Sequence, residues 1–314
     1  MALALKDKRL KMSKLEKRNM LIAYTFLAPN FLGFLLFTLV PVVFSVILSL
    51  LDWGGGSQAE WVGIGNFSFI FRDFSFSSSN LGIALKNTVF YTAMTVPLTI
   101  VCALSLAIIL NKGVKGANVF RATLFFPYVA SLVAICVCWN FLLMKDGIVN
   151  QLLRGLGFNM EKSWTSSSTL AIWAIIIVST WRNAGYYMVM YLAGLQGVPA
   201  ELYEAATVDG ANAWQKFRKV TLPMLTPTTF FCTIMMVISC FKIYDVVAIM
   251  TQGGPGRSTK MLVTYIFELS FGGEGIATSA QYGVASAVST VLLVVVLLVT
   301  FIQFRGEKKW VNYM

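Results

Sequence analysis

Long runs of apolar residues, separated by short polar segments, dominate the pattern along this chain. A helix that crosses a bilayer core of about 30 Å needs roughly 20 mostly apolar residues, and in lipid every backbone N–H and C=O must be bonded within that segment. Six runs meet this requirement, at about residues 21–50, 85–110, 122–144, 169–195, 224–250 and 281–304. The pattern therefore predicts an all-α integral membrane protein with six transmembrane helices.

Composition supports this prediction and removes several classes of function. Hydrophobic residues make up 57% of the 314 positions and charged residues only 12%, against about 45–50% and about 25% in soluble domains. The chain has no histidine, which excludes a Ser-His-Asp triad or a histidine metal site. Its five cysteines lie inside apolar runs without metal-ligand spacing, so we interpret them as small hydrophobic residues. The sequence predicts neither a metal site nor a catalytic residue.

The distribution of Lys and Arg predicts the orientation, because positive charge is retained on the cytoplasmic side. Sixteen of the 25 lie before residue 21, after the second and fourth runs, or after the last run. This predicts a basic cytoplasmic segment at 1–20, a six-span domain at 21–304 and a cytoplasmic tail at 305–314. The net charge of +11 is then explained by the basic residues that set the membrane orientation, and no nucleic-acid partner is expected. The first run is far longer than a signal-peptide core, so we expect it to remain in place.

The loop between the fourth and fifth runs, residues 196–223, has the pattern of a helix, a turn and a second helix. Pro199 suits the first position of a helix, and the acidic Glu201 and Glu204 lie near its positive N-terminal end. Gly210 permits a left-handed residue that ends this helix, and Asn212 is suited to cap the next one. The pattern predicts a helix-turn-helix on the cytoplasmic side.

The second helix of this loop is expected to lie on the membrane surface. Trp214 and Phe217 share one face, and the neighbouring basic residues reach lipid headgroups. In the first helix, the small Ala205 and Ala206 beside Glu204 would permit close packing in a groove of another protein. Amphipathicity indicates an interface without identifying the partner, so an amphipathic connector with no further role remains an alternative at this point.

The same loop resembles a known signature. The order Glu-Ala-Ala, three residues, Gly, nine residues, a hydrophobic residue, any residue and Leu-Pro is found in the permease subunits of binding-protein-dependent ABC importers. In this chain it falls on Glu204, Ala205, Ala206, Gly210, Val220, Leu222 and Pro223, with Asp209 just before the glycine. The segments RATLFFP from Arg121, LAGLQGVP from Leu192 and TQGGP from Thr251 are similar to the carbohydrate branch, and to the first permease of maltose-type and glycerol-phosphate-type importers.

The resemblance implies a set of partners in a bacterial cytoplasmic membrane. A second permease, a dimeric cytoplasmic ATPase and an extracytoplasmic solute-binding protein would assemble with this chain. The segment from Glu204 to Gly210 would enter a cleft of the ATPase and couple it to the spans. ATP and Mg²⁺ would be used by that ATPase, whereas this chain would bind no cofactor and would not be an enzyme. The long extracytoplasmic insertion of the largest family member is absent.

A carbohydrate needs aromatic faces and polar groups in a place shielded from water, and the fourth and fifth runs supply both. The candidate pathway residues are Arg182, Asn183, Tyr186, Tyr187, Ser239 and Tyr244. Alignment through the loop signature implies that substrate-lining positions of the maltose-type permease fall on Thr180, Asn183, Tyr186, Met236, Ser239, Cys240 and Ile243. We favour Asn183, Tyr186 and Ser239 as sugar-compatible positions, whereas Met236 and Ile243 indicate a cavity shaped for a different substrate.

Three charged residues within these runs have more than one interpretation. Lys242 and Asp245 stand at i and i+3, which favours an ion pair on one helical face over a substrate contact. Arg182 has no partner nearby in the sequence. It either pairs across the bundle or receives the anionic group of an acidic or phosphorylated carbohydrate.

Two other classes of protein remain as alternatives. An ion-gradient-driven secondary transporter would show inverted repeats or runs broken at equivalent places in two halves, and neither is evident. A membrane enzyme would need clustered His, Cys or acidic residues at one depth. The glycine-rich segment 253–260 lacks the spacing of a phosphate loop, and we interpret it as a turn that closes the fifth run.

Overall fold

The computed structural model describes residues 13–113, 115–159, 161–272 and 280–310, and these are predominantly helical. The N-terminal half comprises α1 (Lys14–Phe34), α2 (Val40–Leu48), the hairpin strands β1 (Leu51–Asp52) and β2 (Glu60–Trp61), α3 (Gly65–Phe71), α4 (Asn80–Asn111), α5 (Ala117–Val129), α6 (Leu132–Leu142) and α7 (Ile148–Gly155). The C-terminal half comprises α8 (Ala171–Gln196), α9 (Ala200–Val208), α10 (Ala213–Lys216), α11 (Leu222–Met224), α12 (Thr226–Phe241), α13 (Asp245–Met250), α14 (Leu262–Phe271) and α15 (Tyr282–Trp310). Most of the basic segment predicted at 1–20, and the last four residues of the tail, lie outside the described residues.

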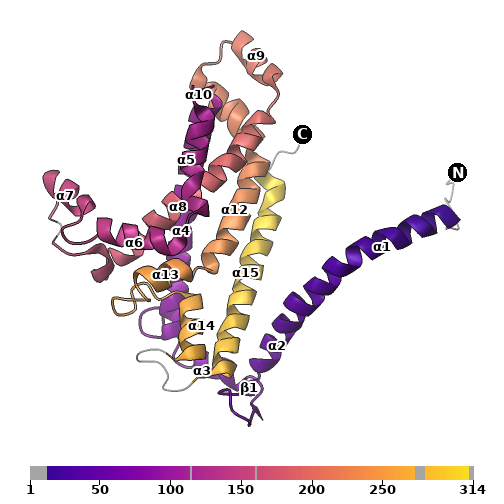
Figure 1. The fold of residues 1–314 in the computed structure, drawn as a ribbon, viewed down its shortest axis with the longest axis vertical. Helices are drawn as coiled ribbons and strands as arrows, with labels where there is room; N and C mark the ends of the chain where they lie inside the picture. Colours follow the sequence, from indigo (N-terminus) through magenta and orange to yellow (C-terminus); the bar gives the residue numbers. More distant parts are fainter. Residues whose placement is uncertain (1–12, 114, 160, 273–279, 311–314) are drawn as a thin grey trace.

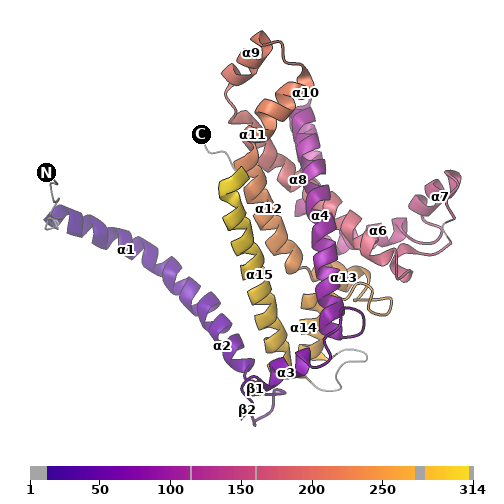
Figure 2. The same ribbon diagram turned by 180° about the vertical axis from the view of Figure 1, so that it is seen from behind.

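Helices α4, α8, α12 and α15 form the body of the molecule (Figures 1 and 2). The largest buried cluster joins α4, α8, α12 and α13, with Tyr191, Ile175 and Met188 of α8 fully enclosed. Helices α9 and α10 lie at one end of this body, and the β1–β2 hairpin and α3 lie at the opposite end (Figure 1). The start of α1 and the end of α15 are both turned toward the α9 end and away from the hairpin.

The first predicted span is a rod that meets the rest of the molecule where α2 contacts α15. Helices α1 and α2 are joined by a π-helical turn at Leu35–Leu39, and the rod diverges from the bundle in both views (Figures 1 and 2). No residue of α1 or α2 is buried, and Phe26 and Phe37 are more than 80% exposed. The rod therefore buries almost none of its apolar surface against the rest of the described chain.

Length and apolarity allow three helical segments to cross a bilayer as continuous helices, at Lys14–Leu48, Asn80–Asn111 and Tyr282–Glu307. Two bent pairs bring the number to five if each pair counts as one span. Helix α8 covers the fourth predicted run but contains buried polar residues such as Ser179 and Thr180. The prediction of apolar helices is confirmed, while the number of six spans remains a prediction.

Two predicted spans are not continuous helices. The run at 122–144 is divided into α5 and α6, whose axes differ by 96°. Ala130 between them is extended (ψ 157°), so the helical hydrogen bonds cannot continue across it. In the run at 224–250, helix α12 ends at Phe241 and helix α13 begins at Asp245. The apolar pattern of a run predicts how many residues lie in lipid or in the protein interior, but it does not predict where the helix bends.

Candidate functional site

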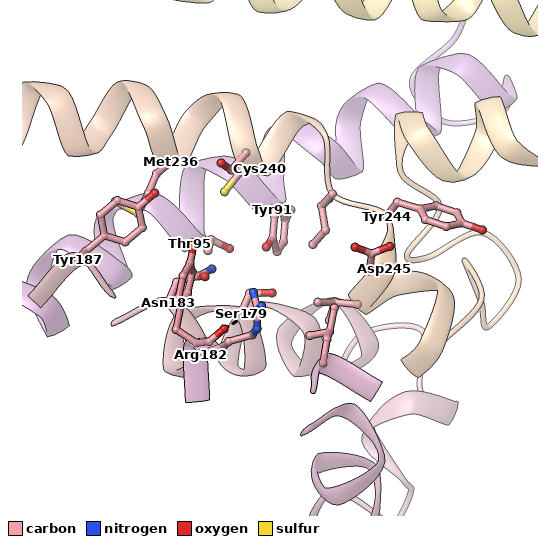
Figure 3. Close-up of a pocket in the computed structure, with 15 residues that line it drawn as sticks. Tyr91, Thr95, Ser179, Arg182, Asn183, Tyr187, Met236, Cys240, Tyr244 and Asp245 are labelled. Carbon is pink, nitrogen blue, oxygen red and sulfur yellow. Dashed lines mark hydrogen bonds between the residues drawn. The ribbon is translucent and has the colours of Figure 1, made fainter. Parts of the chain in front are cut away.

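A cavity of about 230 Å³ lies inside the bundle, between α4, α8 and the α12–α13 junction (Figure 3). Of the predicted pathway residues, Arg182, Asn183 and Tyr187 from α8, Ser239 from α12 and Tyr244 from the junction line it. Met236, Cys240 and Ile243 also line it. The cavity therefore presents one guanidinium, one carboxylate, that of Asp245, one amide and several hydroxyl groups among apolar side chains.

Tyr186 lies next to this wall without lining the cavity. Its ring stacks on Tyr128, with 4.4 Å between ring centres, and meets Tyr187 edge to face at 5.1 Å. Tyr128 and Tyr187 both line the cavity. Aromatic pairs at these separations stabilise each other by about 0.5–1.5 kcal/mol beyond their burial. Tyr186 thus holds two lining rings in position.

Several lining residues were missed by the sequence analysis. Tyr91 and Thr95 of α4 and Ser179 of α8 contribute hydroxyl groups that lie close together. A sequence signal for the α4 residues exists. Four threonines recur at three- and four-residue spacing along this helix, and all four are buried: Thr88, Thr92, Thr95 and Thr99. A threonine stripe at helical spacing marks a polar face inside an otherwise apolar helix.

Arg182 has no carboxylate partner in the described part of the chain. One guanidinium nitrogen, Nη2, donates to the carbonyl oxygen of Tyr128 at 3.3 Å, and the guanidinium carbon lies 5.2 Å from the centre of the Tyr128 ring. Its Nε is buried and lacks a hydrogen-bond partner among the described residues. The cation is therefore positioned by a carbonyl and a ring, and no carboxylate in the described ranges forms an ion pair with it.

The predicted ion pair between Lys242 and Asp245 is wrong. The helix ends at Phe241, and Tyr244 has φ −140° and ψ −56°, outside the helical region. Residues at i and i+3 share a face only along a continuous helix. Both side chains are exposed, Asp245 begins α13 and lines the cavity, and the ion pairs among the described residues include neither residue.

Trp139 of α6 does not line the central cavity. Its ring meets Trp181 edge to face at 5.6 Å, and both line a separate apolar cavity beside α6.

The cysteines in the described chain are free thiols, and three of the five are buried.

The loop at 196–223 folds as the sequence pattern indicates. Helix α9 ends at a left-handed Gly210 (φ 73°). Asn212 caps α10 by accepting from the N–H of Gln215 at 2.9 Å, and the Gln215 side chain accepts from the N–H of Asn212 at 2.8 Å. Pro199 is the residue before the helix, not its first residue as predicted. The rings of Trp214 and Phe217 lie 5.5 Å apart.

The residues of the permease signature between Glu204 and Pro223 are mostly exposed, at the end of the molecule where α9 lies. Glu204 and Ala205 are exposed on α9, and Ala206 is half-buried. Asp209 and Gly210 are exposed at its C-terminal end, and Leu222 and Pro223 begin α11. Helix α9 projects beyond the bundle (Figure 1), so its surface is available to another subunit.

Comparison with known proteins agrees with this arrangement. Residues 84–310 match the family described as the inner membrane component of binding-protein-dependent transport systems. The probable ABC transporter permease protein YesP of Bacillus subtilis is 35% identical and covers 97% of this chain, with 96% of its own length matched. The lactose transport system permease protein LacF of Rhizobium radiobacter is 35% identical, with 95% of this chain and 97% of LacF covered.

A solved structure of a bacterial alginate ABC transporter shares the fold. One of its chains superposes with a TM-score of 0.76 at 23% identity, covering 93% of this chain and 96% of the other. The family match extends over more than half of the chain and includes the cavity and the 196–223 loop. This chain belongs to the family of inner membrane permease components of binding-protein-dependent transport systems.

Proposed function

We propose that this chain forms half of the translocation pathway of an ATP-driven importer for a sugar or oligosaccharide. The observation on which this rests is the internal cavity, where hydroxyl, amide and aromatic groups from α4, α8 and α12 converge inside an apolar bundle. Such a mixture suits a ligand with hydroxyl groups and apolar ring faces. The similarity to a lactose permease supports the same class of substrate.

The proposal includes six spans with both termini in the cytoplasm. The start of α1 and the end of α15 are turned toward the same end of the molecule as α9, which supports a common side. The domain division at 1–20, 21–304 and 305–314 follows from this topology. The 196–223 loop would then be the cytoplasmic coupling element.

The expected partners are a second permease, a dimeric ATPase that uses ATP and Mg²⁺, and an extracytoplasmic solute-binding protein. This chain would bind no cofactor itself. Among the described residues no group of His, Cys, Asp or Glu is arranged to hold a metal ion.

Two measurements test the proposal together. Affinity purification of the tagged chain in mild detergent is expected to recover an ATPase and a second permease. Uptake of labelled lactose, maltose and longer oligosaccharides by intact cells is expected to stop on ATP depletion. Uptake that persists without ATP and stops with an ionophore would contradict the proposal and favour an ion-gradient-driven transporter.

An acidic or phosphorylated carbohydrate is the second candidate substrate, favoured by Arg182, which has no carboxylate partner among the described residues. A cation with a free buried Nε would bind a carboxylate or phosphate strongly. If the substrate is acidic, Arg182→Gln is expected to reduce uptake of a uronic-acid oligosaccharide at least tenfold, because a charged hydrogen bond of about 1.5–3 kcal/mol is lost. Uptake of a neutral oligosaccharide of the same length would change much less. Equal losses for both sugars would exclude the acidic substrate.

A further inference from the structure

A second polar cavity adjoins the central one. It has a volume of about 620 Å³ and lies between α13, the glycine-rich loop at 251–260 and α14. Tyr244 lines both cavities. In Figure 3 the ring of Tyr244 points away from the cluster around Arg182 and Asn183. Tyr244 therefore forms part of the wall of both cavities, at the junction of α12 and α13.

One side chain that lines this second cavity has a polar atom without a hydrogen-bond partner among the described residues. Thr264 of α14 is 4% exposed, and its Oγ1 has no hydrogen-bond partner among the described residues. A buried hydroxyl without a partner costs about 1–3 kcal/mol. Thr264 lines the cavity, so a ligand hydroxyl that reaches Oγ1 would satisfy this atom, and the lining suits a hydroxyl-bearing ligand.

A fixed ion pair lies in the same wall. Nζ of Lys260 is 2.7 Å from a carboxylate oxygen of Glu268, and the two side chains are only 7% and 17% exposed. The backbone carbonyl of Lys260 accepts from Nδ2 of Asn87 on α4 at 3.1 Å, which fixes the end of the loop. Because the pair is neutral overall, it offers donors and acceptors without selecting for a charged ligand.

Aromatic rings line the adjoining side. The rings of Tyr244 and Phe267 lie 5.0 Å apart, and Phe267 is 4.8 Å from Phe271. Phe267 is 43% exposed and lines the cavity. Exposed aromatic faces beside fixed polar groups are the arrangement that binds the apolar face of a sugar ring.

The loop that closes this cavity is held in an unusual conformation. Gln252 is the one residue other than glycine with a positive φ (52°) among the described residues, and Gly253 follows with φ 86°. A Cβ at Gly253 would meet Cγ2 of Thr264 at 3.4 Å. Conformations of this kind persist where the surrounding structure imposes them and cluster at ligand sites.

We propose that this second cavity is a carbohydrate subsite, continuous with the central cavity at Tyr244, so that one oligosaccharide occupies both during transport. The proposal rests on the proposed import of a carbohydrate and extends it to substrates of several sugar units. Thr264, Phe267 and the Lys260–Glu268 pair bind the distal units, and the central cavity binds the others.

The chain length of the sugar provides the test. Cells that lack the chromosomal copy and express Thr264→Val or Phe267→Ala are assayed for uptake of a ladder of labelled galactosides and glucosides, from monosaccharide to hexasaccharide. We expect KM to rise about 3- to 10-fold for the longer members, as loss of one aromatic or hydroxyl contact implies. KM for the shortest transported member should change less than about twofold on the same grounds.

Matched controls lie outside the cavity. Thr99→Val removes another buried hydroxyl that has no partner among the described residues, and Phe301→Ala removes an exposed ring of α15. Both are expected to leave the length dependence unchanged. If Phe267→Ala lowers the amount of assembled complex, Phe267→Leu keeps the apolar volume and removes only the ring.

The outcomes separate the two proposals. Unchanged KM values in the variants, or equal changes at every chain length, would overturn the subsite, while wild-type uptake of the ladder would still support a carbohydrate importer. A wild-type complex that takes up no sugar of any length would overturn the proposed function and the subsite with it.

Discussion

Replacement of Gly210 by proline is expected to abolish transport and to lower recovery of the ATPase with the purified chain at least tenfold. Gly210 has φ 73°, and its N–H donates to the carbonyl of Thr207 at 3.0 Å. Proline fixes φ near −65° and has no N–H, so the turn that orients α9 cannot form. The measurement is quantitative mass spectrometry of the proteins that co-purify with the tagged chain, together with uptake in cells.

Gly210→Asn is the matched control for this change. Asparagine adopts the left-handed region more readily than other residues with a side chain, and a Cβ at position 210 meets no atom within 4 Å. This variant should therefore retain the ATPase and most of the uptake. If Gly210→Pro also retained both, α9 would not be a coupling element, and an amphipathic connector would be the better interpretation.

Charge reversal at Glu204 tests the same surface without altering the backbone. Its side chain is exposed on α9, so Glu204→Lys should leave the fold intact while placing a positive charge at the proposed contact. We expect loss of the ATPase comparable to that of Gly210→Pro, with Glu204→Gln intermediate. Normal expression with normal ATPase recovery for Glu204→Lys would place the contact elsewhere.

Replacement of Gly185 by valine is expected to prevent correct packing of the bundle. Gly185 on α8 lies against the backbone of α5, where an added Cβ would overlap the carbonyl oxygen of Leu124 and reach Cα of Phe125 at 3.0 Å. Backbone atoms cannot rotate away as a flexible side chain can, so α5 and α8 must separate. Overpacking of this kind costs about 1–3 kcal/mol and occasionally more, and small residues are what permit close helix approach in membranes.

The separation would also disturb the cavity, because Tyr128 belongs to α5 and Arg182 belongs to α8. The expected result is a markedly lower melting temperature of the detergent-solubilised chain, measured by size-exclusion chromatography after heating, with uptake near background. Gly155→Ala is the control, since a Cβ there meets nothing within 4 Å. A wild-type melting temperature for Gly185→Val would mean that α5 and α8 do not pack as described.

Local pattern was enough to predict the helical class and the detailed shape of one loop. Runs of apolar residues indicate helices because the backbone in lipid must bond within its own segment. The turn at Gly210 and the cap at Asn212 were predictable because they depend on residues only a few positions apart. Five of the six predicted pathway residues line the central cavity, since the sequence marks polar residues inside apolar runs.

The features that local pattern did not predict depend on contacts between distant segments. The break after Val129 lies in a largely apolar run, and the break after Phe241 falls at Lys242 and Asp245, which the sequence analysis had placed on one continuous helix. Helix α14 was not predicted, because its ten residues are too short to cross a bilayer.

The sequence by itself determined the helical class, how the 196–223 loop turns and to which family the chain is similar, because these properties lie in the bonding and spacing of nearby residues. Only the tertiary structure decided that Tyr91 and Thr95 reach the cavity, that Tyr186 supports its wall and that Tyr244 lines both this cavity and a second one. The physical reason is that a cavity is the space between helices, and its walls come from segments about 150 residues apart that packing alone brings together.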